Sequence, residues 1–201
     1  KAVYVGSDEM TSGAFQGEFL AKFFKDQGKT DISYLMLNGI LGQTSTTNRT
    51  ASVLKALEDN GIKATAAAAP LAADYDRATA MDMISPLLKT TKYDCIISNN
   101  DAMALGAVEA MQQQGLDPKS VPIVGIDATA DGRQAIKDGT LAMTVFQNAE
   151  GQGRASLQAA ANLIDGKPIA EGTGYEVDDE NEFIIWVPFE PVTVDNVADY
   201  D

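Results

Sequence analysis

The chain has 201 residues, 45% of them hydrophobic, and its 29 acidic and 15 basic residues leave a formal net charge of -14. A chain of this size buries a sizeable core and folds as one domain, or as one domain with an appendage. The negative charge repels phosphate backbones and anionic lipid, so nucleic acid is not an expected partner.

Histidine is absent and cysteine occurs once, at Cys95. The chain therefore lacks the commonest general base and transition-metal ligand, which excludes Ser-His-Asp triads. A single cysteine excludes an internal disulfide, and its place in an apolar run predicts a buried, unreactive thiol. No apolar run is long enough for a membrane span.

Short apolar runs alternate with longer segments of helical period along the chain. The expected strands are residues 3–5, 32–37, 62–67, 95–97, 123–126, 143–146 and 183–187. The expected helices are residues 13–26, 46–60, 76–89, 101–114, 130–137 and 149–165. Asp101 and Thr129 are the expected N-caps of two of these helices, and glycines follow most of the helices. This alternation predicts an α/β fold, a doubly wound parallel sheet with helices on both faces.

The stretch after residue 170 is polar and acidic, and it ends in the run Asp-Asp-Glu-Asn-Glu at residues 178–182. A solvated hairpin loop explains these acids. Calcium binding is the alternative, but the ligand spacing of a calcium loop is missing. Phe183 and Trp186 lie in the alternating strand that follows, where core positions are expected.

Polar side chains follow several expected strands, and ligands bind beyond the carboxyl ends of strands in a doubly wound sheet. They are mostly amides and carboxylates, with one arginine and one tyrosine, and they offer the paired donors and acceptors that a neutral polyhydroxyl compound needs. No glycine-rich phosphate loop is present, so nucleotide binding has no support. Polar residues at strand ends also serve as helix N-caps and turns, which is the structural alternative.

Three motifs carry a resemblance to a known family. They are Val-Gly-Ser-Asp at 5–8 with Ser-Gly-Ala-Phe-Gln-Gly at 12–17, Ser-Asn-Asn-Asp-Ala-Met-Ala-Leu-Gly-Ala-Val-Glu-Ala at 98–110, and Val-Gly-Ile-Asp-Ala at 124–128. The chain resembles the type-1 periplasmic sugar-binding proteins of ABC importers over nearly its whole length. The middle motif is similar to that of the galactose/glucose binders.

This resemblance implies a set of sugar-contacting residues. Arg49, Asn100 and Asp127 match the family's contacts with their identity preserved. The resemblance implies that Arg49 and Asn100 donate to sugar oxygens. It also implies that the Asp127 carboxylate accepts from two neighbouring hydroxyls, which is a strong, charge-assisted arrangement.

Four further matched positions depart from the galactose/glucose pattern. Gln43 and Ser45 stand where that family has a histidine and an aspartate, Tyr75 replaces a stacking tryptophan, and Gln147 replaces an asparagine. Tyrosine retains an apolar face for a sugar and glutamine retains amide hydrogen bonds. The resemblance therefore implies sugar binding with an altered specificity. The family's calcium loop after the first helix is missing, and neither a metal nor a cofactor is expected.

The family folds as two α/β lobes that close on the sugar, and the resemblance implies how this chain divides between them. Residues 1–8 match a crossing segment from the amino-terminal lobe, most of which is expected to be absent. Residues 9–147 and 189–201 match the carboxyl-terminal lobe. Residues 148–188 hold a helix and a strand that normally belong to the other lobe. Uncovered apolar faces on that helix and strand predict self-association.

The resemblance implies a non-enzymatic solute receptor, periplasmic or extracellular and lipid-anchored in some parent proteins. It would deliver a galactose- or glucose-like monosaccharide to an ABC permease, with a chemoreceptor as a further partner. The effector-binding core of a LacI-type repressor is the alternative, since it shares the fold. A small α/β enzyme is a second rival, which the lack of histidine and of a phosphate loop disfavours.

Overall fold

The computed structural model describes residues 2–200, which divide into two compact units. Unit 1 comprises residues 2–8 and 147–189, and unit 2 comprises residues 9–146 and 190–200. Each unit is described by itself.

The framework of unit 2 is a parallel sheet with the strand order β3-β2-β5-β6. Single parallel bridges, Val124 with Met143 and Asp127 with Phe146, join the β6 and β7 segments, and β10 pairs with β7. The short β4 pairs with the end of β2. The strands are β2 (Asp31–Asn38), β3 (Lys63–Ala66), β4 (Leu71–Ala72), β5 (Cys95–Ser98), β6 (Ile123–Val124), β7 (Thr144–Gln147) and β10 (Phe189–Val192).

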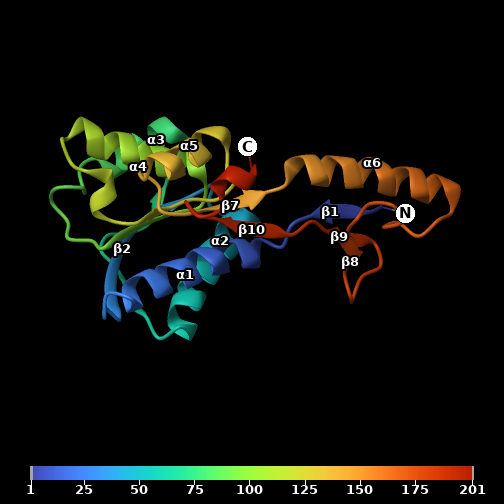
Figure 1. Cartoon of the computed structure of the whole chain (residues 1–201), viewed down its shortest axis with the longest axis horizontal. Coiled ribbons are helices and arrows are strands. Elements are labelled where there is room, and N and C mark those ends of the chain that lie inside the picture. The colour runs from blue at the N-terminus through green and yellow to red at the C-terminus, as the bar shows by residue number, and fades with distance from the viewer. Residues whose placement is uncertain (1, 201) are drawn as a thin grey trace. The chain divides into compact units, whose positions relative to one another are not determined.

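Five helices cover the two faces of this sheet, α1 and α2 on one side and α3, α4 and α5 on the other (Figure 1). The expected α/β fold with a parallel sheet is thereby confirmed. The helices are α1 (Glu9–Lys25), α2 (Thr44–Asp59), α3 (Arg77–Ile84), α4 (Asp101–Gln113) and α5 (Ala130–Asp138).

Helices α1 and α2 pack unusually closely. A Cβ atom on Gly13 would lie 2.3 Å from the Arg49 carbonyl oxygen, and one on Gly17 would lie 2.6 Å from that of Val53. Only glycine permits this approach. It brings the first turn of α1 next to Arg49.

The core of unit 2 follows from the alternation along its strands. Leu35 and Leu37 of β2 point into a buried cluster with residues of α3, α4 and α5. Cys95 is free and fully buried, as predicted, and burial raises the pKa of its thiol. The thiol therefore stays protonated and inert.

Several elements differ from the expected ones. Helix α3 ends at Ile84 because Pro86, two residues later, has no N–H to continue the helix. Asn100, not Asp101, is the N-cap of α4, since its side chain accepts from the Met103 N–H. Thr129 caps α5 as predicted. The strands β4, β8 and β10 were not predicted, because such short or proline-containing segments show no clear alternation.

Unit 1 consists of a three-stranded sheet and one helix. Its strand order is β1-β9-β8, with β1 parallel and β8 antiparallel to β9. A small core forms from Ala159, Ile169 and Ile185. The elements are β1 (Tyr4–Gly6), α6 (Ala149–Asp165), β8 (Glu176–Val177) and β9 (Ile184–Trp186).

The acidic stretch of unit 1 forms a tight turn between β8 and β9, as a hairpin loop requires. The Asp178 carboxylate accepts from the backbone N–H groups of Glu180 and Asn181 and from the Trp186 indole. Phe183 and Trp186 are half-buried, so the expectation of core positions is wrong for both. The Trp186 indole N–H donates to the Asp178 carboxylate at 2.7 Å, which holds the ring beside the hairpin turn.

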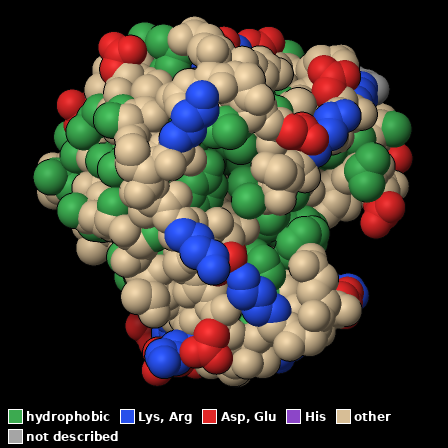
Figure 2. Space-filling view, turned by 90° about the vertical axis from the view of Figure 1, so that its left-hand side faces the viewer, with side chains coloured by type: hydrophobic (Ala, Val, Ile, Leu, Met, Phe, Trp, Pro, Cys, Tyr) green, Lys and Arg blue, Asp and Glu red, His purple; other side chains and the backbone are tan. Residues whose placement is uncertain are grey.

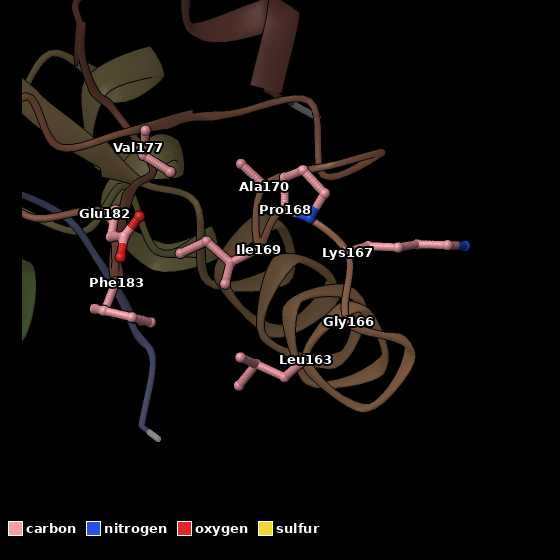
Figure 3. A pocket seen from close by; sticks show the side chains of 9 residues that line it. All are labelled: Leu163, Gly166, Lys167, Pro168, Ile169, Ala170, Val177, Glu182 and Phe183. Atoms are coloured by element: carbon pink, nitrogen blue, oxygen red, sulfur yellow. The ribbon is translucent and has the colours of Figure 1, made fainter.

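Unit 1 also has an open pocket of about 450 Å³ beside the end of α6 (Figure 3). Leu163, Ile169, Val177 and Phe183 contribute apolar side chains to its wall. A unit this small does not cover its own apolar surface.

On the face shown in Figure 2, acidic and basic side chains are scattered among hydrophobic and other polar ones. Neither sign forms a continuous patch on this face. Among residues 2–200, no helix has the length and hydropathy needed to cross a bilayer.

Candidate functional site

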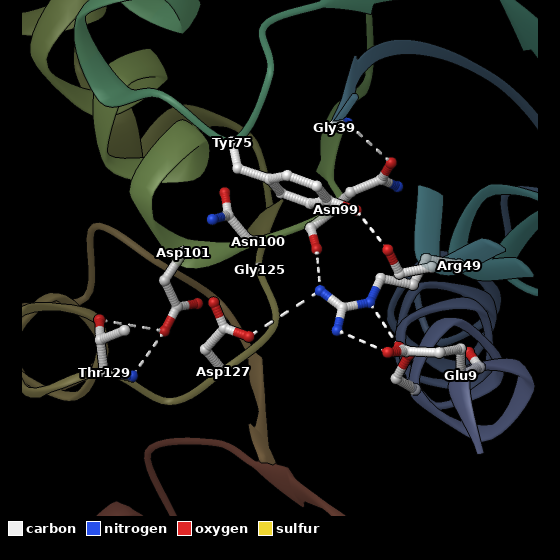
Figure 4. A network of polar contacts seen from close by, with 12 residues as sticks. Glu9, Gly39, Arg49, Tyr75, Asn99, Asn100, Asp101, Gly125, Asp127 and Thr129 are labelled. Carbon is white, nitrogen blue, oxygen red and sulfur yellow. Dashed lines mark hydrogen bonds and ion pairs between the residues drawn. The ribbon is translucent and has the colours of Figure 1, made fainter. Parts of the chain in front are cut away.

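The topology of unit 2 places the candidate site. After β2 the chain moves to β3 on one side, then returns to place β5 on the other side of β2. The order of strands reverses at the boundary between β2 and β5, and ligands of doubly wound sheets bind at such a point, beyond the carboxyl ends of the strands. Asn99, Asn100 and Asp127 follow β5 and β6 at this edge, and Arg49 of α2 and Tyr75 reach the same place (Figure 4).

Arg49 is the centre of the polar network. Its side chain is only 6% exposed, and it forms a two-pronged pair with Glu9, from Nε at 2.6 Å and from Nη2 at 3.2 Å. Nη1 donates to the Asn99 carbonyl oxygen at 2.8 Å and lies 3.9 Å from Asp127 Oδ1. The guanidinium is therefore fixed by α1 and by the end of β5.

Asp127 follows β6 in a backbone conformation that residues other than glycine seldom adopt, with φ at 119°. Among residues 2–200 its carboxylate accepts no hydrogen bond, and its recorded side-chain contact is the 3.9 Å approach of Arg49. Burial raises the pKa of Asp127 to about 6; Arg49 lowers it and Glu9 raises it further. A carboxylate held without a hydrogen-bond donor in a strained turn is typical of a functional group.

Asp101 lies beneath the loop that carries Asp127. Its buried carboxylate accepts from the Thr129 N–H at 2.8 Å and from the Thr144 hydroxyl at 2.6 Å. Burial raises the pKa of Asp101 to about 7, against the effect of the Thr144 bond, and the charge of Asp127 raises it further. A Cβ atom on Gly125 would come within 2.3 Å of the same carboxylate. Asp101 thus fixes the loop and needs glycine beside it.

The sequence allowed Asn100 to be a ligand contact or a helix N-cap, and its side chain is compatible with both roles. Its Oδ1 accepts from the Met103 N–H at 3.0 Å, which makes it the N-cap of α4. Its Nδ2 makes no hydrogen bond to a residue in the described part of the chain, and the side chain lies beside Asp127 and Tyr75 (Figure 4). One end of the amide is therefore structural, and the other keeps its donors.

Tyr75 and Ser45 form the wall of the site opposite Asp127. The Tyr75 hydroxyl bonds with the hydroxyls of Ser45 at 2.9 Å and Thr46 at 2.8 Å. The Tyr75 backbone has a φ of 64°, and a Cβ atom on Gly39 would lie 2.1 Å from its ring. The aromatic ring is therefore held in one place by α2 and by the glycine after β2.

Six of the seven predicted site residues belong to unit 2, whereas Gln147 belongs to unit 1. Gln43 is exposed, and its side chain makes no capping bond at the start of α2. Gln147 ends β7 and is counted with unit 1. Arg49, Asn100, Asp127, Tyr75 and Ser45 all lie within unit 2.

Sequence reasoning missed the side chains that support the site. Gln16 of α1 is fully buried and donates to the carbonyl oxygens of Ser98 at 2.8 Å and Gly125 at 3.0 Å, which ties together the ends of β5 and β6. Glu9 precedes the expected helix at 13–26 and was given no role, whereas the observed α1 begins at Glu9. Gln16 stands inside one of the family-like motifs, which was a usable signal, whereas no local pattern indicated Glu9.

The site presents a guanidinium, an amide N–H donor, a carboxylate acceptor and an aromatic ring. Within residues 2–200, no group of three or more carboxylate or thiol side chains is placed to hold a metal ion. These features define a binding site for a polar, uncharged molecule on an α/β scaffold.

A comparison with known families agrees with this class. Residues 1–168 match the periplasmic binding protein domain, and the chain belongs to this family. The resemblance drawn from the motifs is thereby confirmed.

Two curated relatives match over the whole chain. The D-galactose/methyl-galactoside binding periplasmic protein MglB of Haemophilus influenzae is 36% identical over 212 residues. A putative rhizopine-binding protein of Rhizobium meliloti is 32% identical over 201 residues. Each match covers 100% of this chain but only 61% and 60% of the relative, respectively, so the chain spans about three fifths of their length.

Solved structures share the fold. An ABC transporter solute binding protein from Bacillus halodurans with bound myo-inositol superposes with a TM-score of 0.77 at 30% identity, over 98% of this chain and 62% of that one. A solute binding protein from Actinobacillus succinogenes with bound D-allose gives a TM-score of 0.80 over 98% of this chain and 64% of that one, and its 24% identity shows the fold alone. All four named relatives are binding proteins, not enzymes or repressors.

Proposed function

We propose that this chain is the sugar-binding portion of an extracytoplasmic solute receptor that serves an ABC importer. The observation that carries the proposal is the Asp127 carboxylate, which faces the site without a hydrogen-bond donor while Arg49 stays 3.9 Å away. A carboxylate held in this way accepts from two neighbouring hydroxyls of one sugar.

The rest of the site supports the same ligand class. Arg49 and the open Nδ2 of Asn100 supply donors for ring and hydroxyl oxygens. The Tyr75 ring supplies an apolar face for the C–H side of the sugar, and Ser45 and Thr46 hold that ring in place. The names of the relatives, which specify galactosides, rhizopine and myo-inositol, support a small polyhydroxyl ligand.

We assign galactose or glucose as the preferred class, because the motif at 98–110 is similar to that of galactose/glucose binders. We include Gln43 and Gln147 in the proposed ligand site because they match sugar-contacting positions of the galactose/glucose binders. Gln43 is exposed and makes no capping bond, so its matched position alone supports its inclusion.

The proposed mechanism is closure of two lobes on the sugar. Residues 9–147 and 189–201 form the carboxyl-terminal lobe in this proposal, residues 1–8 form a crossing segment, and residues 148–188 belong to the other lobe. The longer relatives support it, since about two fifths of their length has no counterpart here. The proposed partners are an ABC permease and a chemoreceptor, in the periplasm or outside the cell, with a lipid anchor in the parent protein.

Calorimetric titration of the chain with D-galactose, D-glucose and myo-inositol tests this function. At least one sugar should bind, and Asp127→Asn should weaken it about tenfold or more, because a charge-assisted bond contributes about 1.5–3 kcal/mol. Asp131→Asn is the control, since it makes the same charge change at an exposed position of α5. Equal binding by the parent and Asp127→Asn would contradict the proposal.

A further inference from the structure

Two carboxylates, those of Glu9 and Asp127, lie near the guanidinium of Arg49, and Glu9 is bound more closely. Glu9 takes the Nε and Nη2 edge of Arg49 at 2.6 and 3.2 Å, whereas Asp127 stands 3.9 Å from Nη1 (Figure 4). Glu9 is the first residue of α1, and the close packing of α1 on α2 brings it to Arg49.

A guanidinium that is 6% exposed requires a carboxylate partner, because an unpaired buried charge costs several kcal/mol. Glu9 meets this requirement through a two-pronged pair, the strong geometry for arginine. If Glu9 were neutral, the 3.9 Å ion pair of Arg49 with Asp127 would remain to balance the guanidinium charge. A tight pair with Arg49 would then occupy the oxygens that the ligand needs.

We propose that Glu9 is a positioning residue that keeps Arg49 off Asp127 and so reserves the Asp127 carboxylate for ligand hydroxyls. The inference rests on the proposed sugar-binding function for its ligand. Its electrostatic part concerns the chain alone.

The charged groups around Asp127 come from three elements. Glu9 of α1 raises the pKa of Asp127, Arg49 of α2 lowers it, and Asp101 of α4 lies beneath the same loop. Glu9→Gln removes the group that raises the pKa of Asp127 and keeps Arg49, the group that lowers it. The pKa of Asp127 therefore falls in this variant.

The test is a carbon-13 NMR titration of the Asp127 carboxyl with pH in the 201-residue chain without ligand. Glu9→Gln should move the Asp127 midpoint to lower pH. The control Glu18→Gln makes the same charge change at an exposed position of the same helix and should leave the midpoint in place. Glu9→Asp keeps the charge but has a shorter side chain, so it should shift the Asp127 midpoint less. This variant replaces Glu9→Gln in the titration if Glu9→Gln does not fold.

The second readout is the affinity for D-galactose at pH 7.5. Loss of a nearby negative charge alone would keep Asp127 ionised and leave binding equal or stronger. The proposal predicts instead that Glu9→Gln binds about tenfold more weakly, because Arg49 occupies the acceptor. An unchanged midpoint in both Glu9 variants, or undiminished affinity in Glu9→Gln, overturns the proposal. If the parent binds no sugar while the midpoint shifts, the sugar-binding function fails and the electrostatic role of Glu9 stands.

Discussion

At the scale of single residues, several side chains of the site make a structural bond with one group and leave another group facing the site. Asn100 caps α4 with its oxygen and offers its nitrogen to the site, and Tyr75 anchors its hydroxyl on Ser45 and Thr46 while its ring forms a wall. Arg49 is fixed by Glu9 on one edge. Because the supporting bonds exist before the ligand arrives, little side-chain entropy is lost on binding.

Ligand preference is the prediction at this scale. Tyr75→Trp combined with Gln43→His restores the residues of the galactose/glucose pattern, and we expect the double variant to change the ranking of D-galactose, D-glucose and other monosaccharides. A wider aromatic ring and an imidazole alter which hydroxyls are contacted. Calorimetric titration with each sugar measures the ranking. An unaltered ranking would place specificity in other residues.

The proposed ligand contacts could be predicted better than the residues that support them. Arg49, Asn100 and Asp127 stand in recognisable motifs or follow apolar runs. The role of Glu9 depends on the packing of α1 against α2, and that of Asp101 on a loop and a strand that are 28 and 43 residues away. Such distant pairings leave no local pattern in a single sequence.

At the scale of elements, the loop between β6 and α5 carries Asp127 and has a strained backbone. Asp127 and Ala128 both have positive φ, at 119° and 51°. Asp101 holds the loop through Thr129, while Thr144 of β7 holds Asp101. The strain in the loop is thus offset by hydrogen bonds from neighbouring elements.

The buried carboxyl of Asp101 makes stability depend on pH. Its pKa is raised from 3.8 to about 7 in the folded chain, so its contribution is full below pH 3.8 and is lost as the pH rises through 7. This shift corresponds to at most about 4 kcal/mol. We expect the Asp101→Asn substitution to remove most of this loss of stability with rising pH.

Urea unfolding of the parent and Asp101→Asn between pH 4 and pH 8 measures the effect. The free energy of unfolding of the parent should fall relative to that of the variant as the pH rises. Glu109→Gln, in the same helix but half-exposed, is the control. Parallel pH profiles for the parent and Asp101→Asn would show that the Asp101 carboxyl is ionised throughout.

The long strands and helices were predictable because each carries several periods of its hydrophobic pattern. Helix α3 was overestimated because its apolar period continues past Pro86, where the backbone cannot donate. Strand β4 has only two residues, and its existence depends on the end of β2. Pairing of that kind is tertiary and is not written in local sequence.

At the scale of the whole molecule, unit 1 carries the two most exposed large hydrophobic side chains of residues 2–200. Leu157 and Ile164 are 76% and 86% exposed, and because they are seven residues apart they share one face of α6. The open pocket between α6 and the strands adds Leu163, Ile169 and Phe183. Surfaces of this kind favour association.

We expect the 201-residue chain to self-associate in a concentration-dependent way through this surface. The double variant Leu157→Glu with Ile164→Lys places opposite charges on the exposed face of α6 without changing the net charge, and it should be mainly monomeric. Val194→Lys changes an exposed residue of unit 2 and should associate like the parent. Sedimentation velocity over a range of concentrations measures this, and a parent that is monomeric throughout would contradict the expectation.

The measurement that tests the central claim most directly is an NMR titration of the chain with D-galactose, followed at the Arg49 Nε–H and the Asn100 side-chain amide. We predict saturable shifts of both signals with a dissociation constant in the millimolar range, about -4 kcal/mol, because the chain supplies only part of the contacts that a two-lobed receptor makes. The Gln113 side-chain amide on the exposed side of α4 should not shift. Saturable shifts confined to residues away from the carboxyl ends of β5 and β6, or no saturable shift with any monosaccharide, would contradict the assignment of this site.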